Sequence, residues 1–293
     1  MRTDHRDVSD EGFVRTLSNA ERSYLAELAL YQTVIESTVV ISVNQHGIDT
    51  DGRGIRASRI YTRQTLTALS LDAILPRPSA AEPHDSILWD IGSIASLARN
   101  LIEGYLGLYY FGIESITESE AELRFFLLQL HRNVEWYGVR KLTNAEDSSL
   151  KEFEEGIQTQ KKRVEEHPFL GSLTAEQRNR ALRGAEMYKT KADFERELVV
   201  CKNLRRNYRL LSNLVHPLPL SIERVDFERG RGVGSDPDVN YCVLCLMLAR
   251  VYLAASTVAF ADHFPKALAK RFKKKIDSIR SLASIDYEAN ADA

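Results

Sequence analysis

Glycine and proline are scarce in this chain, and this scarcity constrains the fold more than any other feature of the sequence. The 293 residues include 15 glycines and 8 prolines, and neither residue occurs from position 13 to position 46. Both residues interrupt helices, so long stretches without them favour long helices. Apolar residues recur there at three- and four-residue intervals, as on one face of a helix. We therefore predict an all-α fold, a multi-helix up-and-down bundle.

Short polar or proline-containing segments separate the predicted helices. A turn at 44–52 joins the first two helices into a hairpin, and three prolines within 75–83 mark the clearest linker. We predict an N-terminal helical hairpin at 1–75 packed on the core, a helical bundle core at 84–283 and a frayed tail at 284–293. The expected helices span residues 10–43, 53–74, 85–111, 117–141, 144–166, 173–188, 192–215, 239–263 and 265–283.

Capping residues predict where three of these helices begin. Asp85 or Ser86 precedes the third helix, and either side chain can accept a hydrogen bond from the unpaired amides of its first turn. Thr117 and Thr174 each lie three residues before a glutamate or glutamine, which is the spacing of a capping box.

The overall composition is that of a soluble globular protein, with 44% hydrophobic and 27% charged residues. A formal net charge of −2 gives no global reason to expect nucleic acid or an anionic membrane as a partner. The N-terminus lacks the apolar core of a signal peptide. Three cysteines argue against a disulfide framework and fit a reducing compartment. We expect a cytoplasmic location.

The longest apolar stretch, 241–261, requires a choice between a membrane span and a core helix. Arg250 lies near its middle, and a charge at the centre of a bilayer is costly. We therefore predict a buried core helix and no membrane association. Cys242 and Cys245 lie in the same stretch without a second pair of metal ligands, so we expect core cysteines, no metal site and no cofactor. The glycines at 230–234 follow no strand and indicate a loop.

The segment 208–216 carries the residues best suited to chemistry. At about 100° per residue, five polar side chains share one helical face: Arg205, Tyr208, Arg209, Ser212 and His216. Arginine can hold phosphate oxygens bidentately, and histidine can exchange a proton near neutral pH. Such a row suits phosphate chemistry, but it also suits a satisfied structural network inside a bundle. The residues alone favour the structural interpretation.

A second charged pair lies in the third predicted helix. Arg99 and Glu103 are spaced i, i+4 within an otherwise apolar stretch, where isolated charges are costly. They can pair with each other, or they can face the row at 208–216 from across the bundle. Both alternatives remain open at the level of sequence.

Two further basic groups are weaker candidates. Arg124, His131 and Arg132 could form a second basic lining, but a solvated edge is the favoured interpretation. The last predicted helix carries seven basic residues between 266 and 280, and Lys270, Arg271 and Lys274 are its candidates for holding nucleic-acid phosphates. A solvated helical face is again the more common reading of such a run.

Two motifs resemble a known group of proteins. Arg99 and Glu103 in LARNLIEGYLGLYYF resemble the Arg-x-x-x-Glu signature of an uncharacterised family of bacterial all-helical proteins. YRLLSNLVHP resembles its second signature, Tyr-x-x-Leu-Ser-x-x-x-His. That family is similar in turn to the HEPN superfamily, which is marked by Arg-x(4–6)-His. Arg209 and His216 match this spacing, with six residues between them.

The resemblance implies a function and a set of partners. HEPN nucleases are metal-independent endoribonucleases found in toxin and phage-defence systems, and their catalytic rows usually meet at a homodimer interface. By this likeness, Arg209 and His216 are the catalytic pair, supported by Arg99, Glu103, Tyr208 and Ser212. RNA and an antitoxin-like protein are then the expected partners. Because some HEPN-like proteins are not catalytic, the alternative is a helical module that binds a partner through the same polar site.

Overall fold

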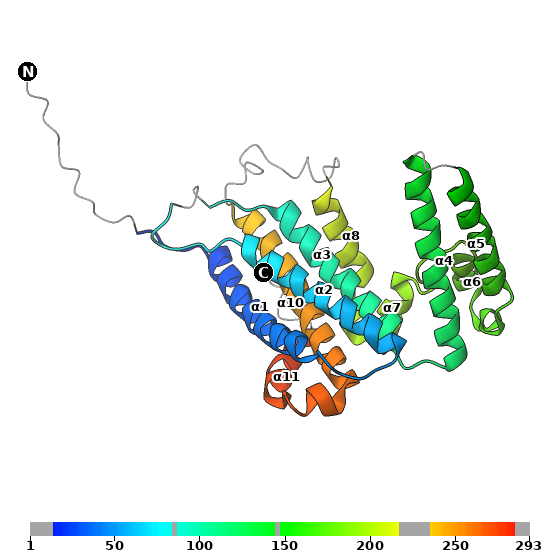
Figure 1. The fold of residues 1–293 in the computed structure, drawn as a ribbon. Helices are drawn as coiled ribbons and strands as arrows, with labels where there is room; N and C mark the ends of the chain where they lie inside the picture. The colour runs from blue at the N-terminus through cyan, green and yellow to red at the C-terminus, as the bar shows by residue number, and fades with distance from the viewer. Residues whose placement is uncertain (1–13, 84–86, 144–146, 217–234, 285–293) are drawn as a thin grey trace, which may run out of the picture. The chain divides into compact units, whose positions relative to one another are not determined.

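The computed structural model describes residues 14–83, 87–143, 147–216 and 235–284 (Figure 1). The described residues form helices joined by short loops and contain no β-strand, which confirms the predicted all-α class. Contacts divide the chain into two compact units. Unit 1 comprises the described residues up to Thr50, Ser58–Tyr105 and those from Arg206 onward. Unit 2 comprises Asp51–Ala57 and Leu106–Arg205.

Unit 1 is built around one long apolar helix, α10. It packs along α1 and against the short C-terminal helix α11, and most of its apolar side chains are fully buried. Burial of these side chains is the main favourable contribution to the folding of this unit. The helices that contribute to unit 1 are α1 (Asn19–Asn44), α2 (Gly52–Ile74), α3 (Ile91–Leu108), α8 (Leu204–Val215), α10 (Asp236–His263) and α11 (Lys273–Arg280).

Within the described part of the chain, α1 and α10 have the length and apolar composition of a membrane span, a property that buried helices of soluble proteins share. In α10, 78% of the most apolar stretch is buried inside the protein. The interior arginine Arg250 forms an ion pair with Glu27 of α1, and it donates a hydrogen bond of 2.9 Å to the Leu282 carbonyl. This helix is therefore packed as a core helix, as its sequence predicts.

A seam of polar side chains crosses the core of unit 1. The hydroxyl oxygens of Thr38 in α1 and Thr257 in α10 lie 2.7 Å apart, and the Tyr61 hydroxyl of α2 donates to Thr257 at 3.1 Å. One turn further along α2, Gln64 donates to Ser256 of α10 at 2.9 Å. Since each bond joins different helices, the seam fixes the register of α1, α2 and α10.

The close approach of α2 and α3 in unit 1 depends on Gly104. Gln64 Nε2 also donates to the Leu101 carbonyl of α3 at 3.3 Å. A Cβ atom added at Gly104 would lie 2.6 Å from Gln64 Cγ, so this position accommodates only glycine without rearrangement.

Unit 2 contains the N-terminal turn of α2 and the helices between α3 and α8. α4 packs along α5, and α5 packs on α6 (Figure 1). Its elements are a π-helical turn at Tyr109–Ile113 (η2), α4 (Glu118–Leu142), α5 (Asp147–Glu165), a 3₁₀ turn at Pro168–Ser172 (η3), α6 (Ala175–Leu182), α7 (Lys191–Glu197) and a 3₁₀ turn at Val199–Cys201 (η4).

Several predicted helix boundaries agree with the structure. Thr117 caps α4 by accepting from the Glu120 amide, and Thr174 with Gln177 forms a complete capping box at the start of α6. Ser18 with Glu21 forms another at the start of α1. These agreements follow from local chemistry, because a cap is specified within four residues.

Several predicted helices were wrong in detail. The helix expected at 10–43 begins at Asn19, and the one expected at 173–188 ends at Leu182. The helix expected at 265–283 is a π-helical turn at Pro265–Ala269, then α11, then a 3₁₀ turn at Ser281–Ala283. The helix expected from 85 begins at Ile91, with Asp90 accepting from the Ser93 amide at 3.0 Å; residues 84–86 lie outside the described part of the chain. The single helix expected at 192–215 is α7, a 3₁₀ turn and α8. The break contains two adjacent β-branched valines at 199–200, which are weak helix formers, and Asn203 with φ = 63° in the left-handed region.

The two compact units do not divide the chain at 75–84, where the sequence predicted the end of the N-terminal hairpin. Thr38 of α1 and Gln64 of α2 both bond to α10 within unit 1. Residues on both sides of the linker belong to unit 1, and the region from 106 to 205 forms a compact unit of its own. Only Ser284 of the predicted tail is described.

Candidate functional site

Residues 208–215 form most of α8, which presents one apolar and one polar side, and His216 directly follows its last residue. Leu204 and Leu211 are fully buried, seven positions apart on the apolar side. Arg209 and His216 are exposed and lie two turns apart on the polar side. A rise of 1.5 Å per residue separates their backbones by about 10 Å along the helix axis. The two predicted catalytic side chains are therefore accessible from solvent.

The polar rows of α3 and α8 meet through Tyr208. Its hydroxyl donates a hydrogen bond to Glu103 Oε1, and Arg99 Nε donates to the same oxygen at 3.2 Å. The Arg99 guanidinium carbon lies 4.6 Å from the centre of the Tyr208 ring, within the range of a cation–π contact. Both sequence alternatives thus hold in part, because Arg99 and Glu103 pair with each other and also contact α8.

The environment of Tyr208 changes its acidity. Partial burial raises the pKa of the Tyr208 phenol to about 12, and the neighbouring Glu103 carboxylate adds to the increase. The phenol is therefore protonated at neutral pH and acts as a hydrogen-bond donor. Glu103 is 44% exposed at its side chain and Arg99 is 25% exposed, so the group lies at the surface of unit 1.

The other polar residues of α8 have structural partners. Ser212 Oγ donates to the Tyr208 carbonyl at 2.8 Å, one turn earlier in the helix. Arg205, which falls in unit 2, forms an ion pair of 2.5 Å with Glu195. Arg205, Arg209 and His216 are the exposed members of the predicted row, and Tyr208 is the member that joins α8 to α3.

The three predicted phosphate-binding residues Lys270, Arg271 and Lys274 are all exposed in unit 1. They lie around the start of α11, which contacts α1 and α10. Figure 1 shows α11 at the end of this unit remote from the C-terminal end of α8. The two sets of residues therefore do not form one continuous patch.

Arg124 is the main functional candidate whose environment the sequence interpretation missed. The favoured solvated edge was wrong, because Arg124 is 3% exposed. Its Nη1 donates to the Tyr110 carbonyl at 2.6 Å and to Glu114 Oε2 at 2.7 Å, while Nη2 contacts Glu120. Burial alone would lower the pKa of Arg124, but the bond to Glu114 holds it above its ordinary value. The sequence contained one indication of this burial, because Arg124 lies three residues before Leu127, on the apolar side of its helix.

The charged network extends beyond Arg124. The other oxygen of Glu114 lies 2.5 Å from Lys189 Nζ, and Lys189 also pairs with Glu197 at 2.5 Å. By contrast, His131 and Arg132 do not share the environment of Arg124. His131 Nδ1 lies 3.2 Å from the Gly184 carbonyl, and Arg132 is exposed.

No protein-family model, no curated protein and no solved structure matches this chain. The resemblance to HEPN proteins therefore rests on the two short motifs alone. The comparisons add no fold relative, and the site has to be interpreted from its own geometry.

Proposed function

We propose that the exposed face of α8 that carries Arg209 and His216 is the active site of a metal-independent endoribonuclease. The observation that carries the proposal is the solvent exposure of both side chains on one helix face, two turns apart. An arginine and a histidine so placed can reach one phosphodiester of a bound strand, since both side chains are long enough to converge over about 10 Å. The match to the HEPN motif spacing supports the same reading.

The proposed reaction is an internal transesterification. The RNA 2′-oxygen attacks the adjacent phosphorus, the bond from phosphorus to the 5′-oxygen breaks, and a 2′,3′-cyclic phosphate and a 5′-hydroxyl end result. His216 accepts the proton of the 2′-hydroxyl, and water supplies a proton to the departing 5′-oxygen. His216 then returns its proton to solvent. Arg209 stabilises the additional negative charge on the phosphorane oxygens.

The remaining residues of the site act as positioning residues. Tyr208 is fixed to α3 through Glu103, and this bond restrains α8 beside α3. Arg99 in turn lies against the Tyr208 ring. A rigid support holds catalytic side chains in a productive arrangement, which is the role we assign to Arg99, Glu103, Tyr208 and Ser212. The proposed reaction implies RNA as the substrate. The resemblance to HEPN proteins adds an antitoxin-like protein as a regulator, and the low cysteine number favours the cytoplasm as the location.

Incubation of the full chain with single-stranded RNA in the presence of a chelator tests this function. The expected result is cleavage that leaves 2′,3′-cyclic phosphate ends and is reduced about a hundredfold or more in His216→Ala. The same loss is expected in Arg209→Ala. His46→Ala and Arg63→Ala are matched controls, because both residues are exposed in unit 1 and lie outside α8. Equal cleavage by His216→Ala and the wild type would overturn the assignment.

A second candidate function is a non-catalytic module that binds RNA or a protein partner at the same face. The observation in its favour is that Tyr208 and Ser212 bond within the protein, as expected for a rigid surface. RNA binding in a gel-shift assay, weakened in Arg209→Ala and accompanied by no cleavage, would favour this module over the nuclease.

A further inference from the structure

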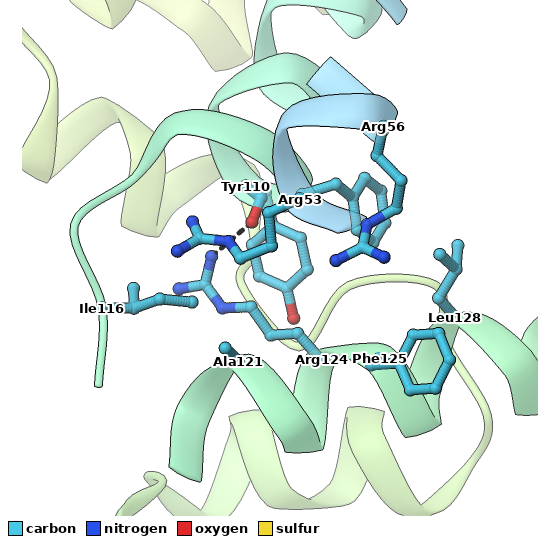
Figure 2. A pocket seen from close by; sticks show the side chains of 9 residues that line it. Arg53, Arg56, Tyr110, Ile116, Ala121, Arg124, Phe125 and Leu128 are labelled. Carbon is cyan, nitrogen blue, oxygen red and sulfur yellow. Dashed lines mark hydrogen bonds between the residues drawn. The ribbon is translucent and has the colours of Figure 1, made fainter. Parts of the chain in front are cut away.

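Unit 2 contains a small pocket that is separate from the α8 site. It lies between the N-terminal turn of α2, the π-helical turn η2 and α4, and its empty volume is about 210 Å³. In Figure 2 the Arg53 and Arg124 guanidinium groups lie beside each other, and Arg56 lies on the side of Phe125 and Leu128. The lining residues used below are Arg53, Arg56, Tyr110, Arg124, Phe125 and Leu128.

The charges at the pocket wall are of one sign. Among the described residues that line it are three arginines and no acidic residue. Arg53 donates to the Glu114 carbonyl at 2.5 Å, and the Arg56 guanidinium lies 5.7 Å from the centre of the Phe125 ring. Neither contact is an ion pair, and the nearby Asp51 charge only partly offsets the effect of burial on both guanidinium groups. These two charges are therefore available for an anion. Arg53 and Arg56 are each partly buried and can be reached from solvent.

Partial burial of these two arginines has an electrostatic cost. Burial lowers the pKa of Arg53, and the nearby positive charge of Arg124 lowers it further. Burial likewise lowers the pKa of Arg56. A bound anion would raise the pKa of both arginines again. Its negative charge would compensate the two desolvated guanidinium groups and would offset the repulsion between Arg53 and Arg124.

Arg124 supplies a second, independent observation. Its Nη atoms bond to Glu114, Glu120 and the Tyr110 carbonyl, yet its Nε is buried and has no hydrogen-bond partner within the described part of the chain. Buried donors are rarely left unsatisfied, and such a donor can mark the place of a bound water, ion or ligand. Arg124 thus offers a donor that an acceptor in the pocket would satisfy.

From this geometry we infer that the pocket binds the phosphate group of a small ligand. Arginine forks match the oxygens of a phosphate bidentately, and converging guanidinium groups stabilise a dianion. The enclosed space is small, so we expect the phosphate to enter it and an adjoining apolar group to stay at its mouth. Phe125 and Leu128 provide the apolar side of the pocket for that group.

Titration calorimetry on the full chain with inorganic phosphate and with phenyl phosphate tests this site. Phenyl phosphate is expected to bind more tightly than inorganic phosphate, and phenol is expected not to bind measurably. Arg56→Ala should weaken phosphate binding at least tenfold. Arg56→Lys should give a smaller loss, because lysine keeps the charge but not the fork. Arg59→Ala is the matched control, since Arg59 is exposed on the same helix outside the pocket.

Three outcomes would overturn the inference. The first is no binding of either phosphate at millimolar concentration and constant ionic strength. The second is equal weakening in Arg59→Ala and Arg56→Ala, which would indicate a general surface effect. The third is binding of RNA without terminal phosphates, lost in Arg56→Ala, while phenyl phosphate fails to compete; that result would indicate a polynucleotide surface. Because the site is independent of α8, retention of phosphate binding in His216→Ala separates it from the nuclease proposal.

Discussion

The Tyr208 hydroxyl donates a hydrogen bond to Glu103, a residue 105 positions earlier in the chain. This bond joins α8 to α3 within unit 1. Together with the contact of Arg99 on the Tyr208 ring, it links the two motifs at 99–103 and 208–216, which share no local sequence relationship. The bond is expected whether the α3–α8 contact only stabilises the fold or also supports the proposed active site. Its strength can therefore be measured without assuming either role.

The acidity of Tyr208 reports on this bond. We expect the Tyr208 phenol to titrate near a pKa of 12, with burial as the main cause and Glu103 as the second. Glu103→Gln should lower the pKa toward its ordinary value of about 10. Nuclear magnetic resonance of tyrosine labelled at Cζ measures the titration, and Tyr208→Phe identifies the signal. An unchanged pKa in Glu103→Gln would show that the carboxylate has no part in the shift.

The same shift predicts a pH dependence of stability. The folded state favours the neutral phenol, so the stabilising contribution of Tyr208 is complete below its unfolded pKa of about 10. This contribution is lost as the pH rises toward about 12. Urea unfolding at several alkaline pH values should show a shallower loss of stability in Tyr208→Phe than in the wild type.

Substitution of Arg124 should strongly destabilise unit 2. Arg124→Ala leaves the half-buried carboxylates of Glu114 and Glu120 without their main partner, at a cost of about 3–5 kcal/mol. Arg196→Ala is the matched control, because the Arg196 side chain is 70% exposed in its ion pair with Asp193 and such pairs contribute about 0–1 kcal/mol. Denaturant unfolding followed by circular dichroism measures both. Equal losses in the two variants would contradict the buried network.

Two glycine substitutions should have opposite effects on stability. Gly104→Ala places a methyl group against the buried Gln64 side chain and should cost about 1–3 kcal/mol. Gly138 is exposed within α4 and has no atom within 4 Å of an added Cβ, so Gly138→Ala should stabilise by about 0.5–1 kcal/mol. Thermal unfolding gives both values. A smaller cost of Gly104→Ala in a Gln64→Ala background would assign the loss to this contact.

The three cysteines should be unreactive in the native protein. Cys201, Cys242 and Cys245 are buried thiols. Burial raises the pKa of the Cys245 thiol to about 12, and it also raises the pKa of Cys242. Since the thiolate is the reactive form, a thiol reagent should label none of them rapidly at neutral pH and all of them in denaturant. Rapid labelling of Cys242 or Cys245 under native conditions would contradict the core assignment of both residues.

The sequence predicted what local chemistry specifies. Helix class and the caps at Thr117 and Thr174 depend on residues within one or two turns, and these predictions were correct. The split of the helix expected at 192–215 was missed, because tertiary packing and a left-handed Asn203 outweighed a continuous helical pattern. The two compact units were missed as well, since the contacts that define them join residues far apart in the chain.

The candidate site was predictable only in part. Periodicity placed Arg209 and His216 on one face of a helix, and the structure exposes both. The contact between Tyr208 and Glu103 was one of two open alternatives, because periodicity gives the face of a residue but not the helix opposite. The pocket at Arg53 and Arg56 was not foreseen, since its residues come from three elements that only the tertiary fold brings together.

The seam of Thr38, Tyr61 and Thr257 has a consequence for how this sequence can change over time. Each hydroxyl is paired with another from a different helix and also bonds to a main-chain carbonyl. Loss of any one therefore removes a buried bond between helices, while the remaining hydroxyls keep their main-chain partners. An apolar residue at one position thus weakens the reason to keep a hydroxyl at the other two. Among homologous chains, the three positions should vary as a correlated set, with either a polar seam or an entirely apolar one.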